Sequence, residues 1–203
     1  MLATIILAAG DSTRMGRPKA LLPDPDGRPF VARLVRSFTA AGIDRAVVVT
    51  GSQHEAIVKA TIADCPPILA DCVRNPDPSR GQLSSLWVGL DAVESPDLDG
   101  VLVTPVDIPM IRSATIRLVV EAWTRTRAPI VRPAVGDRHG HPVLFDRIVF
   151  DALRHAPLSE GARVVVHAYA DQLVNVEVDD DRCLVDVDTP ADYETVISKE
   201  PHI

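Results

Sequence analysis

Short apolar runs alternate with segments of helical spacing along nearly the whole chain, and this alternation limits the fold more than any other feature. Strands are predicted at residues 4–8, 46–50, 68–73, 101–104, 129–134, 142–145, 173–178 and 183–187. Helices are predicted at residues 30–41, 55–63, from about 82, along the stripe from Ile116 to Trp123, at 161–169 and from 190. Strands that alternate with helices indicate a mostly parallel sheet covered on both faces. We therefore expect one three-layer α/β/α domain over residues 1–203, with a Rossmann-like sheet.

Composition narrows the classes of function. The chain has 203 residues, of which 46% are hydrophobic and 24% charged, as in an ordinary globular protein. Its net charge of -7 argues against a nucleic-acid partner. The three cysteines include no Cys-x-x-Cys pair, so neither a zinc site nor a disulfide framework is indicated. The apolar start is too short for a signal peptide or a membrane span, so we expect a cytoplasmic protein without a membrane partner.

The first predicted strand leads directly into a loop rich in glycine, hydroxyl and cationic residues, at residues 9–19. Gly10 permits a sharp turn and a close approach to a ligand. The backbone amides of residues 9–13 can then face phosphate oxygens, and Arg14 and Lys19 supply positive charge. The spacing fits neither a Walker loop nor a dinucleotide fingerprint. We predict a polyphosphate site; the alternative is a glycine-rich turn with surface arginines.

An acidic residue follows the predicted strand at 101–104. Asp107 lies between Pro105 and Pro109, at the carboxyl end of a parallel strand, where open α/β sheets place their ligands. A carboxylate there repels phosphate unless it holds a cation, and Mg²⁺ suits one or two carboxylates together with phosphate oxygens. Asp107 is therefore a predicted metal ligand; the alternative is that it caps the following turn.

A second acidic cluster begins at Asp186. If residues 183–187 form a strand, Asp186 and Asp188 lie on one face of it, and either could be the second metal ligand. Thr189, Pro190 and Asp192 are typical of a helix start, which predicts a capping role for Asp192.

Three further polar side chains are candidates for ligand contact. Ser84 and Ser85 lie in the first turn of a predicted helix, whose N-terminus favours anions, and they face a nucleotide or cap the helix. His141 follows the flexible Gly140 at a strand start, and it is predicted to face the substrate. His139 is a weaker candidate, and a histidine without any role is the alternative for both.

Five motifs, in order along the chain, resemble those of the nucleotidyltransferases related to the molybdenum cofactor enzymes, the MobA/MocA-like NTP transferase family. They are Leu-Ala-Ala-Gly-x-Ser-x-Arg-Met-Gly-x-x-Lys from residue 7, Gly-x-x-Ser-Ser-Leu from 81, Asp-x-Pro from 107, Gly-His-Pro-Val-Leu-Phe from 140 and Asp-x-Asp-Thr-Pro-x-Asp-Tyr from 186. The resemblance covers essentially the whole chain. Leu-Ala-Ala-Gly is similar to the cytidylyltransferase branch, whereas guanylyltransferases of this type usually have Ala-Gly-Gly.

The resemblance implies a sheet of the nucleotide-diphospho-sugar transferase type and Mg²⁺-dependent transfer of a nucleoside monophosphate. The donor would be CTP, and the acceptor a small phosphorylated molecule such as molybdopterin, with release of pyrophosphate and a client molybdoenzyme as a further partner. The implied site residues are Lys19, Arg14 and Asp107 for catalysis, Asp107 and Asp188 for Mg²⁺, His141 for the acceptor, and Leu7, Ala8, Ala9, Gly10, Ser12, Arg14, Lys19, Ser84 and Ser85 for the nucleotide. Leu83 and Trp87 depart from the family pattern, which often has serine and arginine there.

Other functions stay open at this point. The same chemistry could use GTP or a sugar- or alcohol-phosphate acceptor. The loop could instead hold the pyrophosphate of NADPH in an oxidoreductase, with Mg²⁺ dispensable and Asp107 structural. The paired acids Asp107 and Asp188 argue against that alternative, because a dinucleotide site has no use for them. A non-catalytic nucleotide-binding partner of a larger enzyme is the remaining possibility.

Overall fold

The protein is built on a single mixed β-sheet, seen in a computed structural model that describes residues 1–10, 12, 14–63, 65 and 69–199. The strands are β1 (Leu2–Ala8), β2 (Arg45–Thr50), β3 (Leu69–Arg74), β4 (Gly100–Pro105), β5 (Ile130–Val135), β6 (Arg138–His139), β7 (Val143–Asp146) and β8 (Val174–Glu177). Their order is β3-β2-β1-β4-β7-β5-β6, and β8 pairs with β5. The strands β3, β2, β1 and β4 are parallel, as is the β5–β8 pair, whereas β7 runs antiparallel to both of its neighbours.

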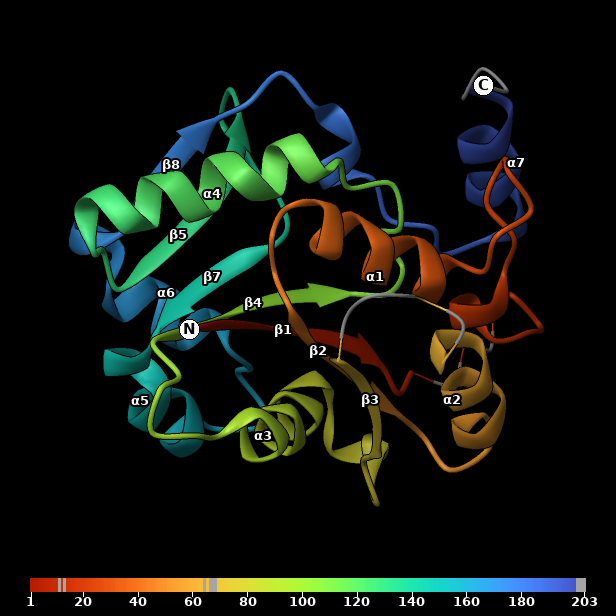
Figure 1. Ribbon diagram of the computed structural model, residues 1–203, viewed down its shortest axis with the longest axis horizontal. Coiled ribbons are helices and arrows are strands. Elements are labelled where there is room, and N and C mark those ends of the chain that lie inside the picture. The colour runs from red at the N-terminus through yellow and green to blue at the C-terminus, as the bar shows by residue number, and fades with distance from the viewer. Residues whose placement is uncertain (11, 13, 64, 66–68, 200–203) are drawn as a thin grey trace.

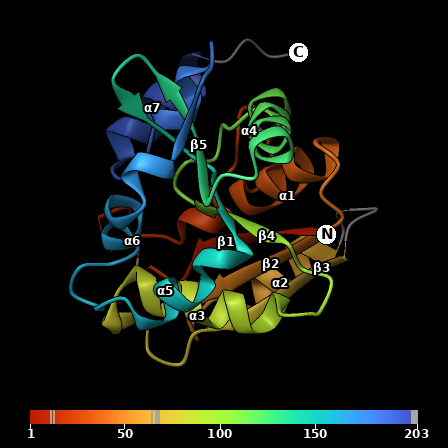
Figure 2. The ribbon, with the colours of Figure 1, turned by 90° about the vertical axis from the view of Figure 1, so that its left-hand side faces the viewer.

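Helices cover both faces of this sheet. They are α1 (Phe30–Ala40), α2 (Glu55–Ala63), α3 (Gln82–Val93), α4 (Ser113–Thr126), α5 (Phe150–His155), α6 (Arg163–Ala168) and α7 (Pro190–Lys199). The helices α1 and α4 lie on one side of the sheet, and α3 and α5 lie on the other (Figures 1 and 2). The expected three-layer architecture is thereby confirmed.

Side chains alternate along β1, so this one strand contributes to the two hydrophobic cores, one on each face of the sheet. Ile6 packs with residues of α1 and α4, whereas Ile5 and Leu7 pack with residues of α3. All three side chains are almost fully buried, as expected for a strand covered on both faces. This packing fixes the direction of β1 and hence the point where its loop leaves the sheet. Among the described residues, no helix combines the length and the apolar character needed to cross a membrane.

Most predicted elements are present within a few residues of their expected bounds, but the strand predicted at 183–187 is wrong. Residues Asp181–Leu184 form a 3₁₀ turn. Single backbone bonds join this stretch to two different segments: the N–H of His141 donates to the carbonyl of Cys183, within the turn, and the N–H of Val187, beyond the turn, donates to the carbonyl of Asp107. Two isolated bonds to separate partners do not make a strand ladder, although the apolar alternation is that of a strand.

Short elements account for the other differences. The helix α5 and the two-residue strand β6 were not predicted, because neither is long enough to show a period. The helix predicted at 161–169 is confirmed only over Arg163–Ala168. Residue 68, the first of the predicted third strand, lies outside the described residues.

Candidate active site

A cavity of about 320 Å³ opens at the carboxyl ends of β1 and β4. The strands are neighbours in parallel register, with Leu7 opposite Pro105, so the segments that leave them start side by side. It is the position where open α/β sheets place their ligands. The cavity is lined by these predicted site residues: Leu7, Ala8, Ala9, Gly10, Ser12, Arg14, Lys19, Ser85, Asp107 and Asp188. Ser84 and His141, also predicted, do not line it.

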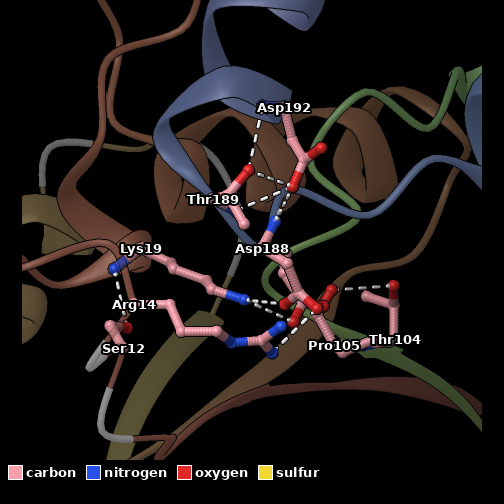
Figure 3. A network of polar contacts seen from close by, with 9 residues as sticks. Ser12, Arg14, Lys19, Thr104, Pro105, Asp188, Thr189 and Asp192 are labelled. Atoms are coloured by element: carbon pink, nitrogen blue, oxygen red, sulfur yellow. Dashed lines mark hydrogen bonds and ion pairs between the residues drawn. The ribbon is translucent and has the colours of Figure 1, made fainter.

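A chain of ion pairs crosses this cavity. The Nζ atom of Lys19 lies 3.1 Å from Oδ2 of Asp107 and 2.5 Å from Oδ1 of Asp188. Arg14 donates from Nη2 to the other carboxylate oxygen of Asp188, at 2.8 Å (Figure 3). The Lys19 side chain is only 12% exposed, whereas that of Arg14 is 67% exposed. One ammonium therefore joins two acids from distant parts of the chain.

These contacts keep Lys19 and Asp188 ionised at neutral pH. Burial lowers the pKa of Lys19, but hydrogen bonds to Asp188 and Asp107 and their negative charges outweigh it, so the pKa is raised. The hydrogen bond from Lys19 in turn lowers the pKa of Asp188. A carboxylate with a lowered pKa contributes stability above its ordinary pKa and loses that contribution as the pH falls through the lowered value. The pair is therefore lost only in acid, when Asp188 is protonated, or in strong base, when Lys19 loses its proton.

Ser12 orders the loop that carries Lys19. Its hydroxyl oxygen accepts from the backbone N–H of Lys19 at 3.1 Å, and its carbonyl accepts from those of Met15 and Gly16. Its φ of 49° lies in the left-handed region, which few residues other than glycine adopt. Ser12 thus has a structural task besides lining the cavity. Residues 11 and 13 lie outside the described residues, so the predicted row of amides is described only in part.

Gly10 was expected to permit a sharp turn of the backbone, but its conformation is one that other residues can adopt. Its φ is not among the positive values, and a Cβ built on it meets no heavy atom of the described residues within 4 Å. The sharp turn therefore does not need glycine, and the reason left for glycine is close approach of a ligand. We expect Gly10→Ala to change the free energy of unfolding by less than about 0.5 kcal/mol. It should raise the Kd for a nucleoside triphosphate roughly fivefold by crowding the cavity. Urea unfolding and calorimetric binding measure the two quantities, and an unchanged Kd would exclude close approach.

Asp188, and not Asp186, reaches the cavity. The backbone bond from Val187 to the carbonyl of Asp107 is 2.7 Å long, and the Val187 side chain is fully buried. Asp188, the next residue in the chain, therefore lines the cavity, whereas Asp186 is exposed and does not line it. The carboxylate of Asp192 accepts from the backbone N–H groups of Asp188 and Thr189 at 3.2 and 2.7 Å (Figure 3), so its predicted capping role is confirmed.

Gly140 allows the segment before Asp188 to approach the sheet. A Cβ at this position would lie 2.6 Å from the carbonyl oxygen of Cys183 and 2.7 Å from its sulfur. No larger residue fits without moving the backbone. The glycine was assigned flexibility from the sequence, and the structure gives it a packing role instead.

Ser84 and Ser85 are held by a residue that sequence analysis missed. Both side chains are buried, and Nδ2 of Asn75 donates to each hydroxyl at 2.9 Å. Ser84 also donates to the carbonyl of Gly81 at 2.7 Å, which leaves Ser85 as the serine that lines the cavity. Neither hydroxyl caps the helix N-terminus. No sequence pattern singles out Asn75, because its partners are set by the tertiary structure.

Removing this amide should destabilise the fold. Asn75→Ala leaves the buried hydroxyls of Ser84 and Ser85 without their donor, and it frees the N–H of Asp77, which donates to the side-chain oxygen Oδ1 of Asn75 at 3.0 Å. We expect the free energy of unfolding to fall by about 1–3 kcal/mol. Asn175→Ala removes an amide whose Oδ1 accepts one hydrogen bond on the exposed surface, from Arg132, and should cost less than about 0.5 kcal/mol. Urea denaturation compares them, and equal losses would contradict the role given to Asn75.

His141 lines a second cavity, of about 470 Å³, which shares Leu7, Gln82 and Pro105 with the first. Its Nδ1 lies 3.3 Å from the carbonyl oxygen of Val103, and burial lowers the pKa of the imidazole, so the ring is neutral at physiological pH. Arg163 lines the same cavity and was not predicted. His139 is exposed on β6 and lines neither cavity.

Trp87 is one of the two departures from the family pattern, and its side chain packs α3 against α5. Its indole Nε1 donates to the carbonyl of Leu153 in α5 at 2.7 Å, and the guanidinium of Arg80 lies 5.8 Å from the ring centroid. It lines neither cavity. Leu83, the other departure, lines the second cavity and adds apolar surface there.

The mixed sheet, with its cavity at the ends of β1 and β4, is that of nucleotidyltransferases with the nucleotide-diphospho-sugar transferase fold. The crystal structure of Rv0371c from Mycobacterium tuberculosis superposes with a TM-score of 0.80 at 28% identity, over 98% of both chains. The crystal structure of Rv0371c in complex with manganese has a TM-score of 0.76 at 26% identity, over 98% of this chain and 99% of that one. The chain belongs to the MobA-like NTP transferase family, whose model matches residues 4–173.

Among curated proteins, a relative from Rhodopirellula baltica is named "Probable molybdenum cofactor guanylyltransferase". It is 33% identical over 128 residues, which are 63% of this chain and 58% of that protein. The chain thus spans little more than half the length of this relative.

Proposed function

We propose that this protein transfers a nucleoside monophosphate from a nucleoside triphosphate to a phosphorylated acceptor and releases pyrophosphate. The observation that carries the proposal is the pairing of Asp107 and Asp188 across Lys19 beside the glycine-containing loop. Two acids and two cations in one cavity suit a metal–triphosphate complex, because the acids attract the metal and the cations attract the phosphates. A dinucleotide site would not need the acids.

The residues present fit a divalent cation. One ammonium contacts an oxygen of each carboxylate, so both acids face a common cation position. Among the described residues, no three His, Cys, Asp or Glu side chains come together to form a complete metal cage. Mg²⁺ usually takes one or two carboxylates and completes its shell with phosphate oxygens and water. Asp107 and Asp188 would hold it, and when bound it would polarise the α-phosphate as a Lewis acid.

The chain itself contributes positioning and charge. An oxygen of the acceptor phosphate attacks the α-phosphorus in line, a P–O bond forms, and the bond to the leaving pyrophosphate breaks. Such reactions depend mainly on alignment and on stabilisation of charge. Lys19 and Arg14 offset the charge that develops on pyrophosphate, while Ser12 fixes the loop that carries Lys19. The backbone of residues 7–10 and Ser85 would hold the nucleotide.

The acceptor belongs in the second cavity. This cavity shares Leu7, Gln82 and Pro105 with the first, so a molecule bound there would lie next to the triphosphate. Its wall combines apolar side chains with the neutral His141, the cationic Arg163 and the acidic Glu160. A flat heterocycle with an anionic group, such as molybdopterin, matches this lining. A client molybdoenzyme would then receive the product.

We propose cytosine as the base of the nucleotide, on the sequence at the end of β1. Ala8 and Ala9 line the cavity within Leu-Ala-Ala-Gly, and the methyl group of Ala9 adds bulk where glycine would leave room. The name of the Rhodopirellula baltica relative favours GTP as the second candidate. We expect Ala9→Gly to shift the ratio of CTP to GTP affinity toward GTP. Parallel titrations of the variant and the wild type measure this ratio, and an unchanged ratio would separate Ala9 from base selection.

Calorimetric titration tests the proposal as a whole. CTP, GTP, ATP and NADPH are each titrated into the full chain with and without Mg²⁺. We expect the wild type to bind CTP tightly only when Mg²⁺ is present. This tight binding should be lost in Asp107→Asn. Tight binding of GTP in its place would keep the transfer chemistry and change the base. Binding of NADPH without Mg²⁺, and of no triphosphate, would refute the proposed function.

A further inference from the structure

We propose that Lys19 occupies, in the nucleotide-free protein, the position that the divalent cation takes in the working complex. Metal and ammonium then compete for Asp107 and Asp188, and the metal binds tightly only after a triphosphate has drawn Lys19 away. This inference rests on the proposed function, since it concerns the same two acids. It predicts the order in which ligands bind at this site: the metal binds together with the nucleotide and not before it.

The contacts of the ammonium resemble those of a bound cation. Nζ of Lys19 lies 3.1 Å from an oxygen of Asp107 and 2.5 Å from an oxygen of Asp188, and the side chain is 12% exposed. The two acids are otherwise joined through the backbone bond from Val187 to Asp107, which keeps them together whether or not the ammonium is present. The cation position is thus prepared by the fold and is filled by the chain itself.

The charges of the free site explain why a metal alone would be held weakly. Lys19 and Arg14 together balance the carboxylates of Asp107 and Asp188. A divalent ion added without displacing either cation would leave the site strongly positive. A triphosphate changes this balance, because its oxygens offer the ammonium a new partner while the metal takes the acids.

A lysine suits this exchange better than an arginine. Its ammonium is a compact charge on a flexible stem with three donors, so it can move between acceptors. The backbone of Lys19 is fixed by its N–H bond to Ser12 and by the 3₁₀ turn Lys19–Leu21, which leaves the stem as the moving part. Arg14, which is far more exposed, donates instead to Oδ2 of Asp188.

Electron paramagnetic resonance of free Mn²⁺ tests the exchange without measuring turnover. Mn²⁺ is titrated into the wild type, Lys19→Met and Lys59→Met in the absence of nucleotide. Lys59 is exposed on α2, so its variant is matched in charge. We expect Lys19→Met to bind Mn²⁺ about tenfold more tightly than the wild type, or 1.4 kcal/mol. Lys59→Met should behave as the wild type. A further Asp107→Asn change in Lys19→Met should abolish the gain.

The second part of the experiment repeats the Mn²⁺ titrations in the presence of a nucleotide. Adding the α,β-methylene analogue of CTP should tighten Mn²⁺ binding to the wild type more than to Lys19→Met, in which no ammonium has to leave. Lys19→Gln serves as a second variant with the same expectations if circular dichroism shows that Lys19→Met is unfolded. Equal Mn²⁺ affinity of wild type and Lys19 variants would overturn the exchange, even if nucleotide-dependent metal binding upholds the proposed function. A gain that depends on Asp107, without any triphosphate binding, would support the competition between Lys19 and the metal and would refute the proposed function.

Discussion

Lys19→Ala is expected to lower kcat by at least about a hundredfold while the protein stays folded. The ammonium is held in the cavity by contacts with both Asp107 and Asp188. Under the proposed function, pyrophosphate gains charge beside it. Two unit charges about 4 Å apart interact by roughly 4 kcal/mol at an effective dielectric constant near 20. A hundredfold loss needs about 2.7 kcal/mol of this to be felt in the transition state alone. Steady-state turnover with saturating CTP or GTP measures the effect.

The matched control is Lys59→Ala, which removes the same charge from the exposed face of α2. It should leave kcat unchanged, so a loss in both variants would point to net charge instead of position. The proposed exchange also predicts the direction of a change in metal dependence. Lys19→Ala should need less free metal than the wild type to reach half of its maximal rate, even as its maximal rate falls. A kcat within a few-fold of the wild type would remove Lys19 from the chemistry.

Asp107→Ala should also reduce kcat by at least about a hundredfold, because one of the two carboxylates that face the common cation position is lost. The fold should survive, since the contact that joins Asp107 to Val187 is made by the backbone carbonyl and is kept in the variant. Activity measured across a range of Mg²⁺ and Mn²⁺ concentrations checks whether the loss is one of metal affinity, of rate, or of both.

Asp186→Ala is the control for this second change. Asp186 carries the same charge but is exposed and lies outside both cavities. It should retain wild-type activity at every metal concentration. If Asp107→Ala were active as well, Asp107 would be reduced to the turn-capping role that the sequence also allows, and the metal site would have to be sought elsewhere.

The sheet and the acid at the end of β4 could be predicted because their signals are local. An unbroken apolar run identifies a strand such as β1, and a proline-flanked acid directly after a strand lies at its carboxyl end. The position of Asp107 therefore needed no knowledge of distant contacts. The same holds for Lys19, which follows β1 within one loop.

Asp188 was predicted for a reason that the structure corrects. Strand alternation was expected to place it beside Asp186, whereas a single backbone bond to Asp107 and the burial of Val187 direct it into the cavity. Bonds of this kind join segments far apart in sequence and leave no period to detect. Asn75 and Arg163 were missed for the same reason. Each matters through neighbours that only the folded chain supplies.

Under the proposed function, the placement of Asp188 ties the chemistry to the least central part of the fold. The family match ends at residue 173, yet the second acid lies beyond it, on a stretch secured by the Val187 bond, by Gly140 packed against Cys183 and by the Asp192 cap. Local opening of a peripheral segment requires less free energy than melting of a central sheet. Competence for metal binding can therefore disappear while β1 to β4 remain native. In this architecture the stability of the enzyme and the stability of its function are separate quantities, and the second is set by the docking of its last helix.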